Sequence, residues 1–279
     1  MFHLVARALP KRLLFRTHAE ALALFHALAR AFPEALALTV MPDHVHLVLP
    51  HADPSRRLAR VMSGYTRWRN HARNENGPVW APHPPPERLP NAQHARRTVR
   101  YVHLNPCRAR LVGDPLAWPY SSHRDAVGFA ARPVRPVEAN PVKFHAWVSG
   151  DPTVSTAGTA LPAGSWGEVE WAEIVDAVGG VCRVAPEALL QRGTPRTLAV
   201  RTAWAHGLRD LAVLTEAVGM DAGSVRRTCA TVPGRGGSFS DPALEACVRA
   251  VGDHRFVALR GGDLLARNPW AWYRAHGYR

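Results

Sequence analysis

The sequence feature that most constrains this chain is the apolar stretch MPDHVHLVL, residues 41–49. Its β-branched and aliphatic side chains favour a β-strand. Side chains alternate between the faces of a strand, so His44 and His46 are expected on one face and Val45 and Leu47 on the other. Two neighbouring neutral imidazoles can bind a divalent cation, although such a site normally needs a third protein ligand. The alternative for an isolated H-x-H pair is two half-buried histidines that bind nothing.

The segments around this stretch predict two further strands and a helix. Residues 2–9 alternate enough for a first strand, and residues 35–41 predict a second. Residues 17–31 predict a helix, with Thr17 as its N-cap and apolar side chains at helical spacing. Pro42 and Asp43 separate the strands over 35–41 and 44–49, which form either a hairpin or one bent strand.

Two arginine-rich helices follow. The first is expected over residues 53–73, with Asp53 as N-cap and Pro54 at the first helical position. The second begins near residue 91 and is expected to stop before Pro106. An arginine-rich helix face can follow a phosphate backbone, and the alternative is a solvated surface. The candidate DNA-binding residues here are Arg67, Arg69, Arg97, Arg100, Arg108 and Arg110.

Net charge points to nucleic acid as the partner. The 279 residues include 35 Lys and Arg against 22 Asp and Glu, which gives a net charge of +13. Almost all of the basic residues are arginines. Guanidinium groups suit phosphates and guanine edges. A GC-rich genome would explain the ratio of arginine to lysine but not the net charge, and an acidic membrane or protein is the other class of partner.

Cysteine spacing and hydropathy exclude several classes. Cys107, Cys182, Cys229 and Cys247 are widely spaced and include no C-x-x-C pair, which argues against a zinc knuckle or a disulfide framework. The N-terminus has no signal-peptide pattern, and no apolar run has the roughly 18 residues of a membrane span. We therefore expect a soluble, cytoplasmic protein with no membrane partner.

The second half of the chain predicts a separate helical domain. Residues 130–165 are rich in proline, glycine and small polar residues and predict a linker, with an ordered patch over 143–148. The expected division is therefore residues 1–129, a linker over 130–165, and a helical domain over 166–279. Within that domain, residues 211–218 and 222–230 predict two helices joined by a tight turn at Gly219.

Tyr101 and Asn105 complete the candidate site. They are four residues apart on the second arginine-rich helix and share one face. A metal ion held by His44, His46 and the Asn105 carbonyl could polarise a phosphate, which the Tyr101 hydroxyl would attack to form a phosphotyrosine ester. Tyr65 is the rival nucleophile, although its amphipathic helix favours a packing role. His103 falls on a different helix face and is expected to contact solvent or the DNA backbone.

These motifs resemble a known family. MPDHVHLVL, a basic helix with GYTRW, and RYVHLNPCRARLV followed by WPYSS are similar to the Y1 tyrosine transposases of the IS200-like superfamily, in particular the REP-associated branch. The resemblance covers residues 1–128. It implies an HUH nuclease fold: an α+β, ferredoxin-like antiparallel sheet flanked by helices. It further implies His44, His46 and Asn105 as metal ligands and Tyr101 as nucleophile.

The resemblance also implies an activity. It is the cleavage and joining of single-stranded or hairpin DNA with Mg²⁺ or Mn²⁺, through a 5′-phosphotyrosine intermediate. Relatives differ in whether the tyrosine attacks within its own subunit, so the sequence does not decide whether the protein forms a homodimer. Two departures are Asp43, where relatives commonly have asparagine, and the segment Trp80–Pro86, which lacks their polar residues. The alternatives are a domesticated, non-catalytic DNA-binding regulator and a metal-dependent hydrolase that uses water.

The second half resembles, more weakly, the C-terminal DNA-binding domain of the replication initiator DnaA. The resemblance rests on IVDAVGGVCRVAPEALLQRG followed by PRTLAVRTAWAHGLRDLAVLTEAVGMDAGSVRRTCA. It implies an all-α domain with a helix-turn-helix that binds double-stranded DNA. Residues 223–230 would be the recognition helix, with Arg226 and Arg227 as DNA-binding candidates. A plain helical bundle is the alternative.

Overall fold

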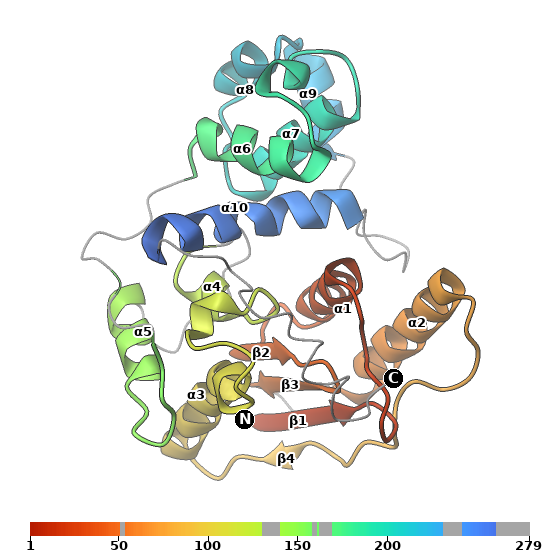
Figure 1. Cartoon of the computed structure of the whole chain (residues 1–279), viewed down its shortest axis with the longest axis vertical. Helices are drawn as coiled ribbons and strands as arrows, with labels where there is room; N and C mark the ends of the chain where they lie inside the picture. Colours follow the sequence, from red (N-terminus) through yellow and green to blue (C-terminus); the bar gives the residue numbers. More distant parts are fainter. Residues whose placement is uncertain (51–53, 130–139, 158–160, 162–168, 231–241, 261–279) are drawn as a thin grey trace.

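A computed structural model describes the chain except for residues 51–53, 130–139, 158–160, 162–168, 231–241 and 261–279. Its N-terminal part combines a small sheet with helices, and its C-terminal part is helical (Figure 1). The fold is therefore α+β, as the sequence predicts. Asp53, the expected N-cap of the first basic helix, lies outside the described residues, as does the last segment of the chain.

The sheet is antiparallel and has the strand order β2-β3-β1-β4. Val40 of β2 pairs with Val45 of β3, so these strands form a hairpin and not one bent strand. Strand β1 lies in the middle of the sheet, with Val5 opposite His46. The four strands are β1 (Phe2–Arg7), β2 (Ala37–Val40), β3 (His44–Leu49) and β4 (Glu87–Arg88).

Helices cover both faces of this sheet. Leu4 and Leu47 belong to a core shared with α1 (His18–Ala31) and α2 (Ser55–Arg73). Val48 belongs to a second core, which it shares with α3 (Ala92–Arg108). Because side chains alternate along a strand, His46 lies on the α3 side together with Val48. The alternation predicted for β3 therefore fixes which helix faces the histidines.

Local capping explains where the helices begin. Thr17 caps α1: its side chain accepts a hydrogen bond from the Glu20 amide, and the Glu20 carboxylate accepts one from the Thr17 amide, both at 3.2 Å. Asn91 caps α3 by accepting a hydrogen bond from the His94 amide at 2.8 Å. Each cap satisfies amides that lack an intrahelical partner. Helix α2 begins at Ser55, one residue after Pro54.

The prediction that the second basic helix stops before Pro106 is wrong. Helix α3 includes Pro106 and continues to Arg108. A proline removes one backbone hydrogen bond, but here it falls near the end of the helix and is buried together with Cys107. The Ala109 amide still donates to the Asn105 carbonyl at 2.9 Å. Burial and the remaining hydrogen bonds keep the last turn helical.

Part of the predicted linker packs on the N-terminal body. Helix α5 (Pro141–Ser149) includes the ordered patch expected over 143–148, and Phe144 and Val148 are buried in the core that includes α3. The division into domains stays a prediction. Short helical segments lie at η1 (Pro115–Ala117) and α4 (His123–Ala126).

The C-terminal helices share a core of their own, and α10 connects that core to the N-terminal body. Leu244, Cys247 and Val251 of α10 pack in the C-terminal core, whereas Phe256 packs in the core that includes α3. Figure 1 shows α10 lying between the two parts. The elements are α6 (Trp171–Cys182), η2 (Pro186–Leu189), α7 (Thr194–Ala205), α8 (Leu211–Val218), α9 (Ala222–Ala230) and α10 (Pro242–Arg260).

The part of the chain that the structure describes includes no helix with the length and apolarity needed to cross a bilayer. The four cysteines are free thiols.

Candidate active site

The structure brings three of the predicted site residues together. His44 and His46 project from β3 toward α3, and their ring centroids are 4.7 Å apart. Asn105 of α3 is buried against them, and its Nδ2 lies 2.9 Å from Nε2 of His46. His46 and Asn105, which are 59 positions apart in sequence, therefore lie next to each other in the fold.

The second nitrogen of each imidazole also has a partner. Nδ1 of His44 lies 2.6 Å from Oδ1 of Asp43, and Nδ1 of His46 lies 3.0 Å from Nε2 of His3 on β1. Burial alone would raise the pKa of the Asp43 carboxyl, but the hydrogen bond with His44 and the charge of that residue hold it below its usual value. The Asp43 carboxylate thus orients the first histidine.

Burial keeps His46 neutral. Its side chain is almost entirely removed from solvent, and this burial, reinforced by His44, His3 and Arg7, lowers its pKa to about 2. A neutral imidazole is the form that binds a metal ion, because a ring nitrogen must present its lone pair. The site can therefore offer a nitrogen ligand throughout the physiological pH range.

The donor set fits a small divalent cation. The lone pairs available to such an ion are on the imidazole nitrogens and the side-chain oxygen of Asn105, because Asn105 Nδ2, the atom 2.9 Å from His46 Nε2, only donates hydrogen bonds. Imidazole and amide oxygen are acceptable ligands for Mn²⁺ and Mg²⁺. Among the described residues no group of three His, Cys, Asp or Glu side chains could hold a metal ion, so a site here needs Asn105.

Tyr101 lies one helical turn before Asn105 and is 40% exposed. Its ring stands edge-on to His46, with centroids 5.6 Å apart, and the Arg108 guanidinium carbon lies 5.4 Å from its centre. The tyrosine is thus next to the histidines, beside a cation and open to solvent.

The predicted DNA-binding arginines near Tyr101 differ in their surroundings. Arg100 donates to the Trp147 carbonyl at 2.6 Å, and Arg108 donates to the Thr153 hydroxyl at 2.9 Å. Both lie within 4 Å of the Asp151 carboxylate, at 3.7 and 3.6 Å. Arg97 and Arg110 are exposed. Contacts with α5 and the loop after it therefore fix Arg100 and Arg108, and of these Arg108 also contacts the Tyr101 ring.

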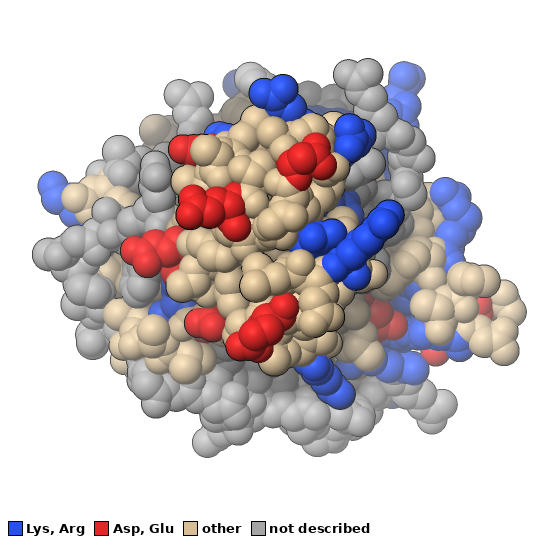
Figure 2. Space-filling model, turned by 90° about the horizontal axis from the view of Figure 1, so that it is seen from above, with Lys and Arg blue, Asp and Glu red and all other residues tan. Residues whose placement is uncertain are grey.

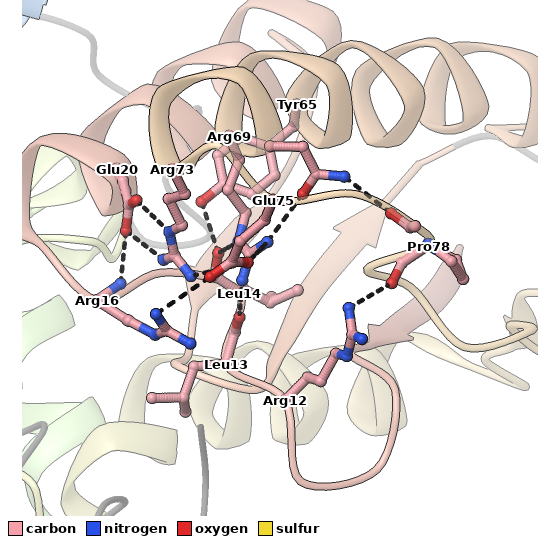
Figure 3. Close-up of polar contacts among 12 residues, drawn as sticks. Arg12, Leu13, Leu14, Arg16, Glu20, Tyr65, Arg69, Arg73, Glu75 and Pro78 are labelled. Atoms are coloured by element: carbon pink, nitrogen blue, oxygen red, sulfur yellow. Dashed lines mark hydrogen bonds and ion pairs between the residues drawn. The ribbon is translucent and has the colours of Figure 1, made fainter.

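Tyr65, the rival nucleophile, has a structural role. It is fully buried, and its hydroxyl donates to the Leu14 carbonyl at 2.8 Å. Burial raises the pKa of its phenol above the usual value. Figure 3 shows it pointing into the network between α2 and the loop before α1. A hydroxyl without solvent access cannot attack a DNA phosphate, so Tyr101 is the better candidate.

Arg69, a predicted DNA-binding residue, is not accessible to DNA, because its guanidinium is buried. The side chain is 1% exposed, and it donates to the carbonyls of Leu14 at 3.1 Å and Leu13 at 3.3 Å and to Glu75 at 3.0 Å (Figure 3). It therefore ties α2 to the loop before α1. Arg67, two residues earlier, is exposed and donates a hydrogen bond to the Ser63 hydroxyl.

This pair provides a matched test. We expect Arg69→Met to lower the free energy of unfolding by about 2–3 kcal/mol, because buried carbonyls lose a charged donor. Arg67→Met should change stability by about 0.5 kcal/mol or less. It should weaken single-stranded DNA binding and reduce the salt dependence by about one phosphate contact. Urea unfolding and fluorescence anisotropy at several salt concentrations measure both; equal stability of the two variants would contradict the assignment.

The prediction for His103 is wrong. His103 is fully buried and not in contact with solvent, and its ring packs against those of His123 and Phe144 at centroid distances of 5.2 and 5.4 Å. His123 is also buried, with Nε2 3.0 Å from Nδ1 of His145. Helix α5 supplies Phe144 and His145, and the sequence does not show that it covers this side of α3. Burial lowers the pKa of His103 to about 3.

This burial predicts acid sensitivity. As pH falls below about 6.5, an unfolded chain binds a proton at His103 while the folded protein does not. The free energy of unfolding should therefore decrease by about 1.4 kcal/mol per pH unit down to the folded pKa, or about 2 kcal/mol between pH 6.5 and 5. Urea unfolding at pH 7 and pH 5 should show a smaller decrease for His103→Met than for the wild type. The exposed His94→Asn should retain the wild-type decrease, and an unchanged decrease in His103→Met would refute the explanation.

Positive charge is concentrated in the N-terminal body. Residues 1–129 include 18 Lys and Arg against 8 Asp and Glu, whereas residues 169–230 include seven of each. Figure 2 shows acidic and basic side chains mixed on the face that the C-terminal helices present. Arg226 and Arg227 of α9 are exposed, with Arg227 donating to the Ser224 hydroxyl at 2.8 Å. The net positive charge of the N-terminal body is therefore larger than that of the C-terminal helices over residues 169–230.

His3 is the site residue that the sequence analysis missed. It lies on β1, diagonally across from His46, and its ring centroid is 6.5 Å from that of Tyr101. The alternating pattern of residues 2–9 places His3 on one strand face, which is the only sequence signal. The strand register, which the sequence does not specify, brings it to the histidine pair.

The fold and site thus define an α+β protein with a histidine–asparagine cluster and an exposed tyrosine on one side of an antiparallel sheet. No family model matches the chain, and a search of curated proteins finds no match. Among solved structures, the chain is similar to a REP-associated tyrosine transposase bound to a REP hairpin, at 22% identity. The match covers 61% of this chain and 92% of that one, with a TM-score of 0.37. We base no conclusion on a likeness of this extent.

Proposed function

We propose that the protein is a metal-dependent single-stranded DNA endonuclease and transesterase of the HUH type, a transposase that acts through a 5′-phosphotyrosine. The observation that supports this proposal best is the juxtaposition of Tyr101 with His46 and Asn105. The tyrosine is exposed, and its ring centroid lies 5.6 Å from that of His46, whose Nε2 faces the Asn105 amide. The concentration of arginine in the same part of the chain favours DNA as the substrate.

The reaction has a simple balance. The Tyr101 oxygen attacks phosphorus and loses its proton, the bond from phosphorus to the 3′ oxygen breaks, and that oxygen takes up a proton. The 5′ phosphate remains esterified to Tyr101, so the broken strand can be joined to another 3′ hydroxyl by the reverse step. His44, His46 and Asn105 would hold Mg²⁺ or Mn²⁺, which when bound supplies charge stabilisation at the scissile phosphate.

The flanking arginines would hold the strand. Helix α3, which carries Tyr101, also carries Arg97, Arg100 and Arg108, and Arg110 follows its end. Arg108, whose guanidinium carbon lies 5.4 Å from the centre of the tyrosine ring, would contact a phosphate next to the scissile bond. Hairpin or repeat DNA is the proposed substrate form, in keeping with the family resemblance of the motifs.

The C-terminal helices are proposed to assist in DNA binding. Helices α8 and α9 are joined by a short turn in which Gly219 has a φ of 62°, a left-handed conformation that glycine adopts readily. This arrangement supports the helix-turn-helix interpretation, with Arg226 and Arg227 as phosphate contacts. The resemblance to the DnaA domain, binding to double-stranded DNA and a homodimer stay predictions.

A covalent-adduct assay tests the proposed function. Wild-type protein is mixed with labelled single-stranded hairpin DNA from the repeats that flank its own gene, with Mn²⁺ or with EDTA, and is then run on a denaturing gel. We expect a protein–DNA adduct with Mn²⁺ and none with EDTA. Tight binding without an adduct would indicate the regulator, and cleavage without an adduct would indicate the hydrolase. Either result would refute the proposed tyrosine chemistry.

A further inference from the structure

A chain of polar contacts extends from the candidate metal ligands to the surface of the sheet. Nε2 of His46 faces Nδ2 of Asn105 at 2.9 Å, and Nδ1 of His46 faces Nε2 of His3 at 3.0 Å. Nδ1 of His3 in turn lies 3.8 Å from Oε2 of Glu87 on β4. Four residues from β4, β1, β3 and α3 are therefore connected in one line.

The proton positions in this line depend on one another. An amide nitrogen only donates, so Nε2 of His46 accepts when Nδ2 of Asn105 faces it. A neutral His46 then has its proton on Nδ1 and donates it to Nε2 of His3, and the His3 proton is on Nδ1, toward Glu87. This arrangement leaves the Nε2 lone pair of His46 on the side of Asn105.

The reverse arrangement is less favourable. It requires a proton on Nε2 of His46, with the Asn105 oxygen toward that proton, and an unprotonated Nδ1 on His3. The lone pair of that nitrogen would then face the Glu87 carboxylate, where two acceptors repel each other. A protonated Nε2 on His46 could not bind a metal ion. The carboxylate at the sheet edge thus favours the proton arrangement that a metal ligand needs.

We propose that His3 is a positioning residue that sets the tautomer of His46. By accepting the Nδ1 proton of His46, His3 keeps Nε2 as the lone-pair donor, and Glu87 supports His3 in that role. The nearly parallel His3 and His46 rings, with planes that differ by 13°, also restrict rotation of the His46 imidazole. The proposal rests on the proposed function only where it takes His46 as a metal ligand.

The geometry around the other histidine supports the same logic. Nδ1 of His44 is 2.6 Å from the Asp43 carboxylate, which accepts a hydrogen bond from it, so the neutral form of His44 has its lone pair on Nε2. Both histidines of the pair thus have an acceptor at Nδ1, one supplied by the preceding residue and the other by the neighbouring strand. The Asp43 carboxylate and the His3 imidazole thus favour the same tautomer for the two histidines on this strand face.

The test is a measurement of tautomers in the metal-free full-length protein. Long-range ¹H–¹⁵N NMR spectra of protein labelled with ¹⁵N-histidine distinguish the two neutral forms, and His46→Gln identifies the His46 signals. We expect the Nδ1–H form for His46 in the wild type and in His3→Gln, whose amide oxygen can accept the same proton. In His3→Phe, which retains an aromatic ring but no acceptor, we expect the Nε2–H form to become the major one. His94→Phe, on the exposed start of α3, is the matched control and should resemble the wild type.

A titration with Mn²⁺ alone, followed by electron paramagnetic resonance, gives the second readout. We expect affinity to fall by about tenfold or more in His3→Phe and to recover in His3→Gln. An Nε2–H tautomer of His46 in the wild type, or an unchanged tautomer in His3→Phe, would overturn the proposal. Failure of the wild type to bind Mn²⁺ would instead refute the metal site, and the tautomers would still decide the role of His3.

A variant at the exposed end of the line keeps the test independent of folding. Glu87 has a side chain that is 65% exposed, so Glu87→Lys should leave the fold intact. Its cation would face Nδ1 of His3 and should increase the Nε2–H fraction of His46. No change in that fraction would contradict the role of the carboxylate, and an Nε2–H form of His46 in the wild type would overturn the role of His3 even if His3→Phe does not fold.

Discussion

Replacement of Tyr101 by phenylalanine is expected to reduce the covalent DNA adduct by roughly 10³-fold or more, because the attacking oxygen is lost. Tyr101 is 40% exposed, so the free energy of unfolding should change by about 0.5 kcal/mol or less. Binding of hairpin DNA and of Mn²⁺ should persist, since the arginines and the His44, His46 and Asn105 cluster are unchanged. Adduct yield on denaturing gels, anisotropy and urea unfolding measure the three quantities.

Tyr65→Phe is the matched control for this experiment. It removes the same atom from a tyrosine whose hydroxyl is buried and donates to the Leu14 carbonyl. We expect it to retain the adduct and to lose about 1–2 kcal/mol of unfolding free energy, because a buried acceptor loses its donor. The opposite pattern, an adduct lost only in Tyr65→Phe, would place the chemistry on α2. Loss of the adduct in neither variant would require a different nucleophile.

The second large effect is expected at the junction of α10 with the N-terminal body. Arg249 is 2% exposed, donates to Oδ1 of Asp125 at 2.7 Å, and also donates to the Pro119 carbonyl. Asp125 is equally buried. Arg249→Met should lower the free energy of unfolding by about 3–5 kcal/mol, because Asp125 loses its arginine partner inside the protein. Urea unfolding measures the change.

The double variant tests the cause of that loss. Combining Arg249→Met with Asp125→Asn removes the charge that lost its partner, so stability should recover in part relative to Arg249→Met alone. Arg226→Met, at an exposed arginine of α9, should change stability by about 0.5 kcal/mol or less. A loss in Arg249→Met no greater than in Arg226→Met would mean that the ion pair does not hold α10 in place.

Several local features could be predicted from sequence because they depend on neighbouring residues only. Thr17 and Glu20 form the capping box that starts α1. The alternation along β3 places His44 and His46 on one face, and the four-residue spacing on α3 places Asn105 one turn after Tyr101. The sequence analysis could therefore name the candidate site before the packing of α3 on the sheet was known.

Burial of charged and polar side chains could not be predicted in the same way. Arg67 and Arg69 occupy the same arginine-rich helix, and only the loop before α1 distinguishes them, because its carbonyls accept hydrogen bonds from Arg69. His103 was placed on the surface because nothing local indicates that α5 covers it. In both cases the deciding partner lies more than 40 residues away in sequence.

The sequence by itself determined β1, β2 and β3, the two basic helices and the spacing of the candidate catalytic residues, since these follow from side-chain periodicity and helix caps. Only the tertiary structure decided which nitrogen of His46 is available, because His3 arrives from β1 and Asn105 from α3. It also decided that α10 joins the two parts, through buried ion pairs between distant segments such as Arg249 and Asp125. Long-range packing determines desolvation, and desolvation determines which polar groups remain accessible for chemistry.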